Sequence, residues 1–290
     1  MKLCLIGHSF GYELEKLIRI FLPFEKIEIC ESRDNSDRAA VTVLSCENGV
    51  TRLSAELILG ENTYTDEKTL ENSAENYEKE CERLIAAALY NCFVAASGYT
   101  PPWGILTGVR PVKLLRRLAE ESNEEQAVKK FENDFFVSNE KIALSRETEH
   151  NERKILELSK PESFSLYVGI PFCPSRCSYC SFVMASIERA EKLIEPYTKL
   201  LCEEIKRTAE IANKLGLRLE TVYFGGGTPT TLSAEQLDTV LGTVNNSFDM
   251  STCREFTVEA GRPDTIDIAK LFALKENKVD RISINPQTVN

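Results

Sequence analysis

The spacing of hydrophobic positions changes near residue 160 and divides the chain into two parts. In residues 1–160, a few short apolar runs are followed by a series of long helical patterns. In residues 161–290, short apolar runs alternate regularly with helical patterns. Because a chain of this length commonly forms two domains, we expect one domain over 1–160 and a second over 161–290.

The first part has the pattern of a mixed α+β domain. Its strand-like runs are LCLIG and KIEIC, which flank an amphipathic helical segment, and the pair AVTVLSC (40–46) and TRLSAELIL (51–59). This pair predicts a hairpin that turns at Glu47-Asn48-Gly49. Helical spacing follows over about 73–96 and in PVKLLRRLAEE, NEEQAVKKFENDF and SNEKIALSRETEHNERKILELS, so we expect the domain to end in helices.

The second part has the pattern of βαβ units. The strand-like runs SLYVGIPF, ETVYFGG, EFTVEAG and DRISIN alternate with helical patterns at about 190–215, 234–245 and 265–277. This alternation predicts a parallel sheet. Because ligands of parallel α/β folds bind at the carboxyl ends of the strands, functional residues are expected directly after each strand.

The charge balance restricts the partners. The chain has 35 Lys+Arg and 45 Asp+Glu, a formal net charge of -10, and this balance gives no positive field to hold nucleic acid or anionic lipid. No apolar run approaches the length of about eighteen residues that a membrane span needs, and charged residues interrupt the N-terminal segment within the length of a signal peptide core. We therefore expect a cytoplasmic protein with no membrane span and no nucleic-acid partner. Its ten cysteines then indicate reduced thiols or metal ligands.

Three cysteines follow the first strand of the second part, in GIPFCPSRCSYCSF. Their spacing is Cys173-x3-Cys177-x2-Cys180. Three soft thiolates suit a [4Fe–4S] cluster, because an iron without a protein ligand is then open to a substrate or cofactor. A structural zinc site is the alternative, but zinc normally takes four protein ligands. The other candidate ligands are distant histidines and two cysteines placed in a helical pattern or before a strand, namely His8, His150, Cys202 and Cys253.

Residues suited to a ligand also follow the other three strands. Gly225-Gly226-Gly227-Thr228 follows the second strand, Glu259 ends the third, and Gln287 follows the fourth. Glycines let backbone groups approach a ligand, a carboxylate accepts hydrogen bonds from hydroxyls, and an amide both donates and accepts. Each of these alone is commonly a turn or a solvated side chain. Together, at successive strand ends, they indicate one site.

The cysteine motif, with an aromatic residue before its last cysteine, resembles the signature of the radical S-adenosylmethionine (SAM) enzymes. LYVGIPFC, TVYFGGGTPT, FTVEA and RISINPQT together resemble the oxygen-independent coproporphyrinogen III dehydrogenase branch, and ILTGVRPVKLL in the first part resembles its HemZ type. The resemblance implies a partial (β/α) barrel with more strands than are predicted here. The expected fold is therefore α/β, an N-terminal α+β domain followed by a radical SAM partial barrel that is truncated at its C-terminus.

The resemblance also assigns site residues. Tyr167 would be catalytic and lie beside the cofactor, and the backbone at Tyr179 would contact the adenine. The metal ligands would be Cys173, Cys177 and Cys180. The remaining SAM-binding residues would be Gly226, Gly227, Thr228, Glu259 and Gln287.

The activity that the resemblance implies is the oxidation of coproporphyrinogen III, an oxidoreductase reaction of haem biosynthesis. A radical derived from SAM removes hydrogen from a propionate, and loss of carbon dioxide leaves a vinyl group. The cofactors would be the [4Fe–4S] cluster and SAM, and the electron donor a flavodoxin or ferredoxin. An acidic protein needs a local basic group to bind the carboxylates of a tetrapyrrole, and Arg176 lies inside the cysteine loop.

Two departures from this branch lead to an alternative. Gly169 stands where the dehydrogenases usually have a histidine, and Phe182 stands where they have a further cysteine. Cys-x-Tyr-Cys-x-Phe is closer to the haem chaperones called HemW. The alternative function is therefore haem binding or haem delivery on the same scaffold. A radical SAM enzyme with an unrelated substrate is a third reading, because fold and cofactor do not fix the substrate.

Overall fold

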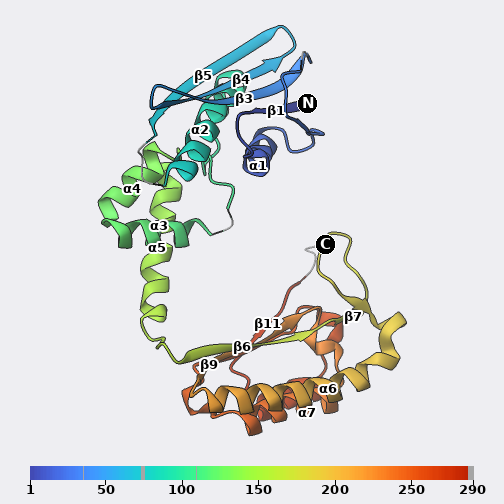
Figure 1. Ribbon diagram of the computed structural model, residues 1–290. Helices are drawn as coiled ribbons and strands as arrows, with labels where there is room; N and C mark the ends of the chain where they lie inside the picture. The colour runs from blue at the N-terminus through green and yellow to red at the C-terminus, as the bar shows by residue number, and fades with distance from the viewer. Residues whose placement is uncertain (35, 73–75, 109, 287–290) are drawn as a thin grey trace. The chain divides into compact units, whose positions relative to one another are not determined.

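The computed structural model describes residues 1–34, 36–72, 76–108 and 110–286. The chain forms two compact units, Met1–Leu156 and Glu157–Asn290 (Figure 1). Among the described residues, no helix combines the length and the low polarity that crossing a membrane requires.

The first unit is built on a five-stranded mixed sheet with the order β2-β1-β3-β4-β5. Strand β1 pairs in parallel with β2 and β3, and the β3-β4 and β4-β5 pairs are antiparallel. The strands are β1 (Lys2–Ile6), β2 (Glu28–Cys30), β3 (Arg38–Glu47), β4 (Val50–Leu59) and β5 (Asn62–Glu71).

The predicted hairpin is confirmed as β3 and β4. Asn48 and Gly49 have φ angles of 51° and 81°, and a two-residue turn with both central residues at positive φ matches the twist of the strands it joins. Strand β5 was not predicted from the sequence. Its core, TYTDEKTL, is mostly polar, as befits the edge of a sheet, and it therefore lacks a strong hydrophobic signal.

Two helices and a helical subdomain complete the first unit. Helices α1 (Gly11–Phe21) and α2 (Tyr77–Ser97) pack against the sheet through a core that includes Leu14, Ile85 and Leu89. A smaller core around Phe131 joins the remaining helices. These are α3 (Pro111–Glu121), α4 (Glu124–Asn133) and α5 (Asn139–Leu156). The predicted α+β fold with a helical end is confirmed.

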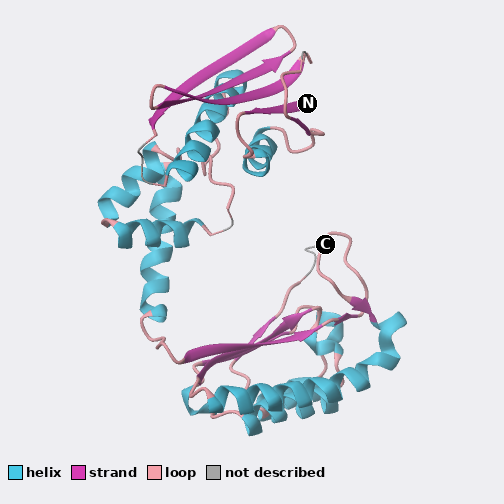
Figure 2. Cartoon of the chain, viewed as in Figure 1, coloured by secondary structure: helices cyan, strands magenta, loops and turns pink. Residues whose placement is uncertain are grey.

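The second unit has a four-stranded sheet in which every strand is parallel to its neighbour, in the order β11-β10-β9-β6. The strands are β6 (Ser163–Ile170), β9 (Arg218–Gly226), β10 (Glu255–Glu259) and β11 (Arg281–Ser283). The helices are α6 (Ile187–Lys214), α7 (Ala234–Ser247) and α8 (Ile268–Glu276). The helices lie on one face of the sheet (Figure 2), and the predicted βαβ alternation is confirmed.

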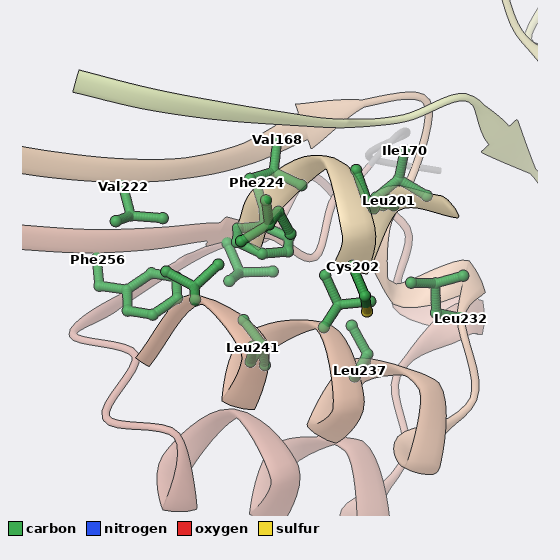
Figure 3. Packing of buried hydrophobic residues seen from close by; sticks show 14 of the residues in the cluster. Val168, Ile170, Leu201, Cys202, Val222, Phe224, Leu232, Leu237, Leu241 and Phe256 are labelled. Atoms are coloured by element: carbon green, nitrogen blue, oxygen red, sulfur yellow. The ribbon is translucent and has the colours of Figure 1, made fainter. Parts of the chain in front are cut away.

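Alternation along the strands separates a packed face from a polar one. Val168, Val222 and Phe224 point toward α6 and α7, where they meet Leu201 and Leu241 (Figure 3). Because successive side chains of a strand point to opposite faces, their neighbours in sequence point away from the helices. The helix-free face therefore carries polar and aromatic side chains that lead to the carboxyl ends of the strands.

Candidate functional site

A cavity of about 530 Å³ lies at the carboxyl ends of these strands. Four segments contribute to it: the cysteine loop (residues 173–184, from the end of β7 to the start of β8), the glycine loop (225–232, from the end of β9 onward), the end of β10 with the loop that follows it (260–267), and the segment after β11 at Asn285. The residues that line it are Cys173, Ser175, Arg176, Cys177, Tyr179, Cys180, Ser181, Phe182, Met184, Gly226, Gly227, Thr228, Glu259, Gly261, Arg262 and Asn285. Segments far apart in sequence thus meet at one place.

The cysteine loop is closed at its base by a short parallel pair of strands. Strand β7 (Phe172–Cys173) pairs with β8 (Ala185–Ser186), and the backbone N–H of Ala185 donates to the carbonyl of Pro171 at 2.7 Å. This closure returns the chain to its starting point and holds the three cysteines within one compact loop.

The glycine loop packs directly against the first cysteine. The backbone N–H groups of Gly227 and Thr228 donate to the carbonyls of Ile170 and Phe172, each at 2.8 Å. A Cβ atom at Gly227 would lie 2.6 Å from the carbonyl oxygen of Phe172 and 3.0 Å from Cys173 Sγ. Gly226 has a φ of 107°, which strongly favours glycine. The glycines therefore permit a close approach between the loop backbone and the cysteine.

The surroundings of the cysteine loop shift several pKa values. Burial raises the pKa of the Cys173 thiol, although a hydrogen bond with Thr228 at 3.3 Å opposes this shift. A hydrogen bond with Cys177 raises the pKa of the Tyr179 phenol. Metal binding to such a thiol requires loss of its proton, so it is coupled to pH.

Glu259 is held by an aromatic pair on the helix-free face. Tyr223 donates a hydrogen bond to Glu259 Oε1 at 2.6 Å, and this bond raises the pKa of Tyr223 to about 12. The ring of Tyr167 stacks on that of Tyr223, with centroids 6.0 Å apart and planes 10° from parallel. The two tyrosines are direct partners in the β6-β9 register. Glu259 therefore presents its carboxylate to the cavity from a fixed position.

Most of the residues assigned from sequence line this cavity together. They are Cys173, Cys177, Cys180, Tyr179, Gly226, Gly227, Thr228 and Glu259. Tyr167 is not among the lining residues, and its ring stacks on that of Tyr223, which donates to Glu259. Gln287 lies outside the described residues.

Sequence reasoning missed several residues of the cavity. The most prominent is Arg262, whose guanidinium is bonded to the cysteine loop at Ser175. Its position three residues after Glu259, in the loop that follows a parallel strand, was the available signal. Met184 and Asn285 also line the cavity, and nothing in their local sequence distinguishes them.

The donor set fits an iron-sulfur cluster. Three thiols line one cavity, and cysteine thiolates are the ligands that such clusters take. A structural zinc site normally takes four protein ligands, whereas three cysteines can hold a cluster and leave one iron open.

Comparison with known families identifies the superfamily to which the second unit belongs. Residues 167–290 match the radical SAM superfamily. The second unit is therefore a radical SAM domain, and the resemblance predicted from the cysteine and glycine motifs is confirmed.

Three curated relatives refine this class. The chain is 38% identical over 214 residues to the oxygen-independent coproporphyrinogen-III oxidase-like protein HemZ of Bacillus subtilis, an alignment that covers 72% of this chain and 43% of HemZ. It is 40% identical to the heme chaperone HemW of Lactococcus lactis, over 46% of this chain and 32% of HemW. It is 35% identical to the oxygen-independent coproporphyrinogen III oxidase of Paracoccus denitrificans, over 43% of this chain and 27% of that enzyme. The chain thus covers less than half the length of each relative.

Proposed function

We propose that this chain is a radical SAM oxidoreductase of the oxygen-independent coproporphyrinogen III oxidase type. The observation that carries the proposal is the convergence of three cysteines, the glycine loop and Glu259 on one cavity at the carboxyl ends of parallel strands. The cavity offers soft ligands on one side and backbone and carboxylate groups on the other. This is the combination that a cluster and a bound nucleoside-bearing cofactor require.

Each group has a distinct role in this proposal. Cys173, Cys177 and Cys180 hold the [4Fe–4S] cluster. Gly226 and Gly227 let the backbone approach the methionine part of SAM, together with Thr228. Glu259 accepts hydrogen bonds from the ribose, since a carboxylate has a second oxygen beside the one that Tyr223 occupies. Tyr179 and Gln287 complete the SAM site. When bound, the cluster and SAM supply one-electron chemistry that removes hydrogen from the substrate.

In this proposal Tyr167 is catalytic and lies beside the cofactor. It lies on β6, and its ring stacks on that of Tyr223. Burial, and next the charge of Glu259, raise the pKa of its phenol. A Cβ atom at Gly225 would lie 3.0 Å from its hydroxyl, so Tyr167 contacts the glycine loop that binds SAM in this proposal.

The extent of the sequence match links the chain to the oxidase-like protein HemZ in both units. The 214 residues aligned with HemZ are more than the second unit contains, so the likeness extends into the first unit. The alignments with HemW and with the Paracoccus denitrificans oxidase span 134 and 125 residues, which is no more than the second unit. The match therefore supports a HemZ-like protein, and the oxidase type is proposed on the description of that relative.

A haem-delivery protein is the second candidate. The observation that favours it is Phe182, which lines the cavity and is 65% exposed at the position where the dehydrogenases have a further cysteine. An exposed aromatic side chain suits contact with a planar tetrapyrrole better than it suits metal binding. The two functions share the cluster and SAM sites and differ in what happens to the tetrapyrrole.

The distinguishing experiment compares turnover with stoichiometric binding. The full chain, reconstituted with iron and sulfide under anaerobic conditions, is incubated with SAM, a reductant, coproporphyrinogen III and a one-electron acceptor, which takes the electron that the substrate radical gives up as it loses carbon dioxide. Release of methionine and carbon dioxide, absent in Cys177→Ala, supports the oxidase. Stoichiometric haem binding without carbon dioxide release contradicts it and supports the chaperone. Absence of both leaves a radical SAM enzyme with another substrate.

The proposal also defines partners. A flavodoxin or ferredoxin supplies electrons, and a reducing compartment such as the cytoplasm keeps the ten free cysteines in the thiol form that a cluster needs. Arg176 is a basic group available to a tetrapyrrole carboxylate, because it lines the cavity, where its guanidinium donates to the carbonyl of Cys180 at 3.3 Å.

A further inference from the structure

We propose that the loop after β10, together with Lys270 on α8, is a brace that fixes the cysteine loop and the glycine loop in their working positions. Arg262 and Lys270 are its two positioning residues. The inference rests on the proposed function, because it assigns cofactor binding to the two loops that are braced. Neither residue needs to touch the cofactor.

Arg262 joins the brace to the cysteine loop. Its Nε and one terminal nitrogen donate to the two carboxylate oxygens of Asp264, at 3.0 and 2.7 Å. The other terminal nitrogen, Nη1, donates to Ser175 Oγ at 2.9 Å and lies 3.5 Å from the Ser175 carbonyl oxygen. The paired bonds to Asp264 fix the plane of the guanidinium. Nη1 is then aimed at a residue 87 positions away in sequence, between the first two cysteines.

Lys270 joins the brace to the glycine loop. Its ammonium donates to the carbonyl of Thr230 at 2.7 Å and to that of Thr265 at 2.9 Å, and its side chain is only 15% exposed. The nearest carboxylate in an ion pair, Asp267, is 4.0 Å away. A largely buried ammonium is costly unless hydrogen bonds satisfy it. Here the ammonium is stabilised by the carbonyls of Thr230 in the glycine loop and Thr265 in the loop after β10, which accept its hydrogen bonds.

A second contact reinforces the join at the glycine loop. The hydroxyl groups of Thr230 and Thr265 are 2.6 Å apart, and both residues are buried. The Thr265 hydroxyl also lies 2.7 Å from the carbonyl of Arg262. The segment Arg262–Thr265 therefore contacts both cofactor loops. The Arg262 guanidinium bonds the cysteine loop, and the Lys270 ammonium bonds the glycine loop.

Loop positions matter here because the site is assembled from separate segments. Charge-assisted hydrogen bonds are about twice as strong as neutral ones, so each cation restrains its own loop more than an ordinary polar contact would. Each connection also acts on a different loop. Removing one cation should therefore loosen one loop and leave the other in place.

Hydrogen exchange of the chain without cluster or SAM tests this separation. The probes are the Cys180 amide, which donates to the Cys177 carbonyl at 3.0 Å, and the Gly227 and Thr228 amides. In Arg262→Met we expect Cys180 to exchange about tenfold faster while the glycine-loop amides change less than about twofold. In Lys270→Met we expect the Gly227 and Thr228 amides to exchange about tenfold faster while Cys180 changes less than about twofold. Each variant thus serves as the other's control.

Two milder variants keep the test decisive if a methionine variant does not fold. Ser175→Ala removes the acceptor hydroxyl of the Arg262 contact, and Thr230→Val removes the hydroxyl that faces Thr265. We expect Ser175→Ala to accelerate exchange at Cys180, and Thr230→Val to accelerate exchange at Gly227 and Thr228, each by a smaller factor than the methionine variants. Unchanged exchange at all probes, or equal acceleration of both loops in each variant, overturns the proposal.

A spectroscopic readout separates positioning from a general effect on folding. In reconstituted protein, Arg262→Met should change the line shape of the reduced cluster signal, and Arg262→Lys should not restore it, because an ammonium cannot reproduce the paired contact with Asp264. Restoration by lysine would show that only the charge matters and would contradict the brace. Since exchange is measured without cofactor, its outcome does not depend on whether the proposed function is right.

Discussion

The hydroxyl of Tyr223 donates to Glu259 Oε1 at 2.6 Å across adjacent strands. Glu259 ends β10, and Tyr223 lies on β9 beside Thr257 in the register. The contact exists only because the two strands pair in this register. It places the carboxylate at the cavity before any ligand arrives, which reduces the ordering that SAM binding would otherwise require.

Removing this hydroxyl should weaken SAM binding. In Tyr223→Phe the ring still stacks on Tyr167, but Glu259 loses its donor and can turn away from the ribose. We expect the Kd for SAM, measured by calorimetry on reconstituted protein, to rise about three- to tenfold. The matched control is Thr221→Val on the same strand, whose hydroxyl donates to Ser165 at 2.7 Å. An equal loss of affinity in both variants would contradict a specific role for the Tyr223 hydroxyl.

Adding a methyl group at Gly227 should prevent cluster retention. The new Cβ would meet the Phe172 carbonyl at 2.6 Å and Cys173 Sγ at 3.0 Å, so the glycine loop and the first cysteine would have to separate. We expect Gly227→Ala to lose most of its iron and sulfide during gel filtration after reconstitution.

The control for this variant is Gly242→Ala on α7. A Cβ there meets only Asn277 Oδ1, at 3.6 Å, and alanine in a helix is favoured over glycine by up to about 1 kcal/mol. Gly242→Ala should therefore retain its iron and unfold at an equal or higher temperature. Full iron content in Gly227→Ala would show that the close packing of the glycine loop is not required.

Some features of the site and fold can be predicted from the sequence, and others cannot. Cys173 and Glu259 follow apolar strands, and the carboxyl ends of parallel strands meet at one edge, so their convergence follows from pattern alone. The Tyr223–Glu259 contact depends on register, which sequence periodicity does not specify. Arg262 was missed because its partner Ser175 is 87 positions away, and only the path of the loop brings them together. Strand β5 was missed because its residues are mostly polar.

A histidine should be accommodated at Gly169. A Cβ there would meet only Tyr167 Cε1 at 3.6 Å, an ordinary contact, so we expect Gly169→His to shift the melting temperature by less than about 3 °C. In contrast, a Cβ at Gly104 would lie 1.8 Å from the Phe135 carbonyl oxygen, and Gly104→Ala should destabilise strongly. Thermal melting followed by circular dichroism compares the two. A large loss in Gly169→His would show that packing, and not function, excludes histidine from this position.

Glu220 should make stability depend on acid pH. It is largely buried, accepts a hydrogen bond from Ser159 at 2.5 Å and lies 2.9 Å from Arg254. The bond with Ser159, aided by Arg254, lowers the pKa of Glu220. Its contribution is therefore complete above the ordinary carboxyl pKa of about 4.3 and is lost as the pH falls through the lowered folded-state pKa.

Urea denaturation at several pH values measures this contribution. Glu220→Gln should be less stable than the parent at pH 7, and the difference should shrink as the pH falls below about 4. Exposed Glu191→Gln should differ little from the parent throughout. A Glu220→Gln deficit that stays constant with pH would contradict a role for the ionised carboxylate.

The central claim is an open-iron cluster held by the three cysteines. It is tested most directly by electron paramagnetic resonance of the dithionite-reduced, anaerobically reconstituted chain, with and without SAM. We predict a [4Fe–4S] signal that shifts when SAM is added, disappears in Cys177→Ala and persists in Cys253→Ala, whose thiol instead bonds the Glu255 carbonyl at 3.4 Å. A signal that does not shift when SAM is added, or one that is still present in Cys177→Ala, would contradict the account.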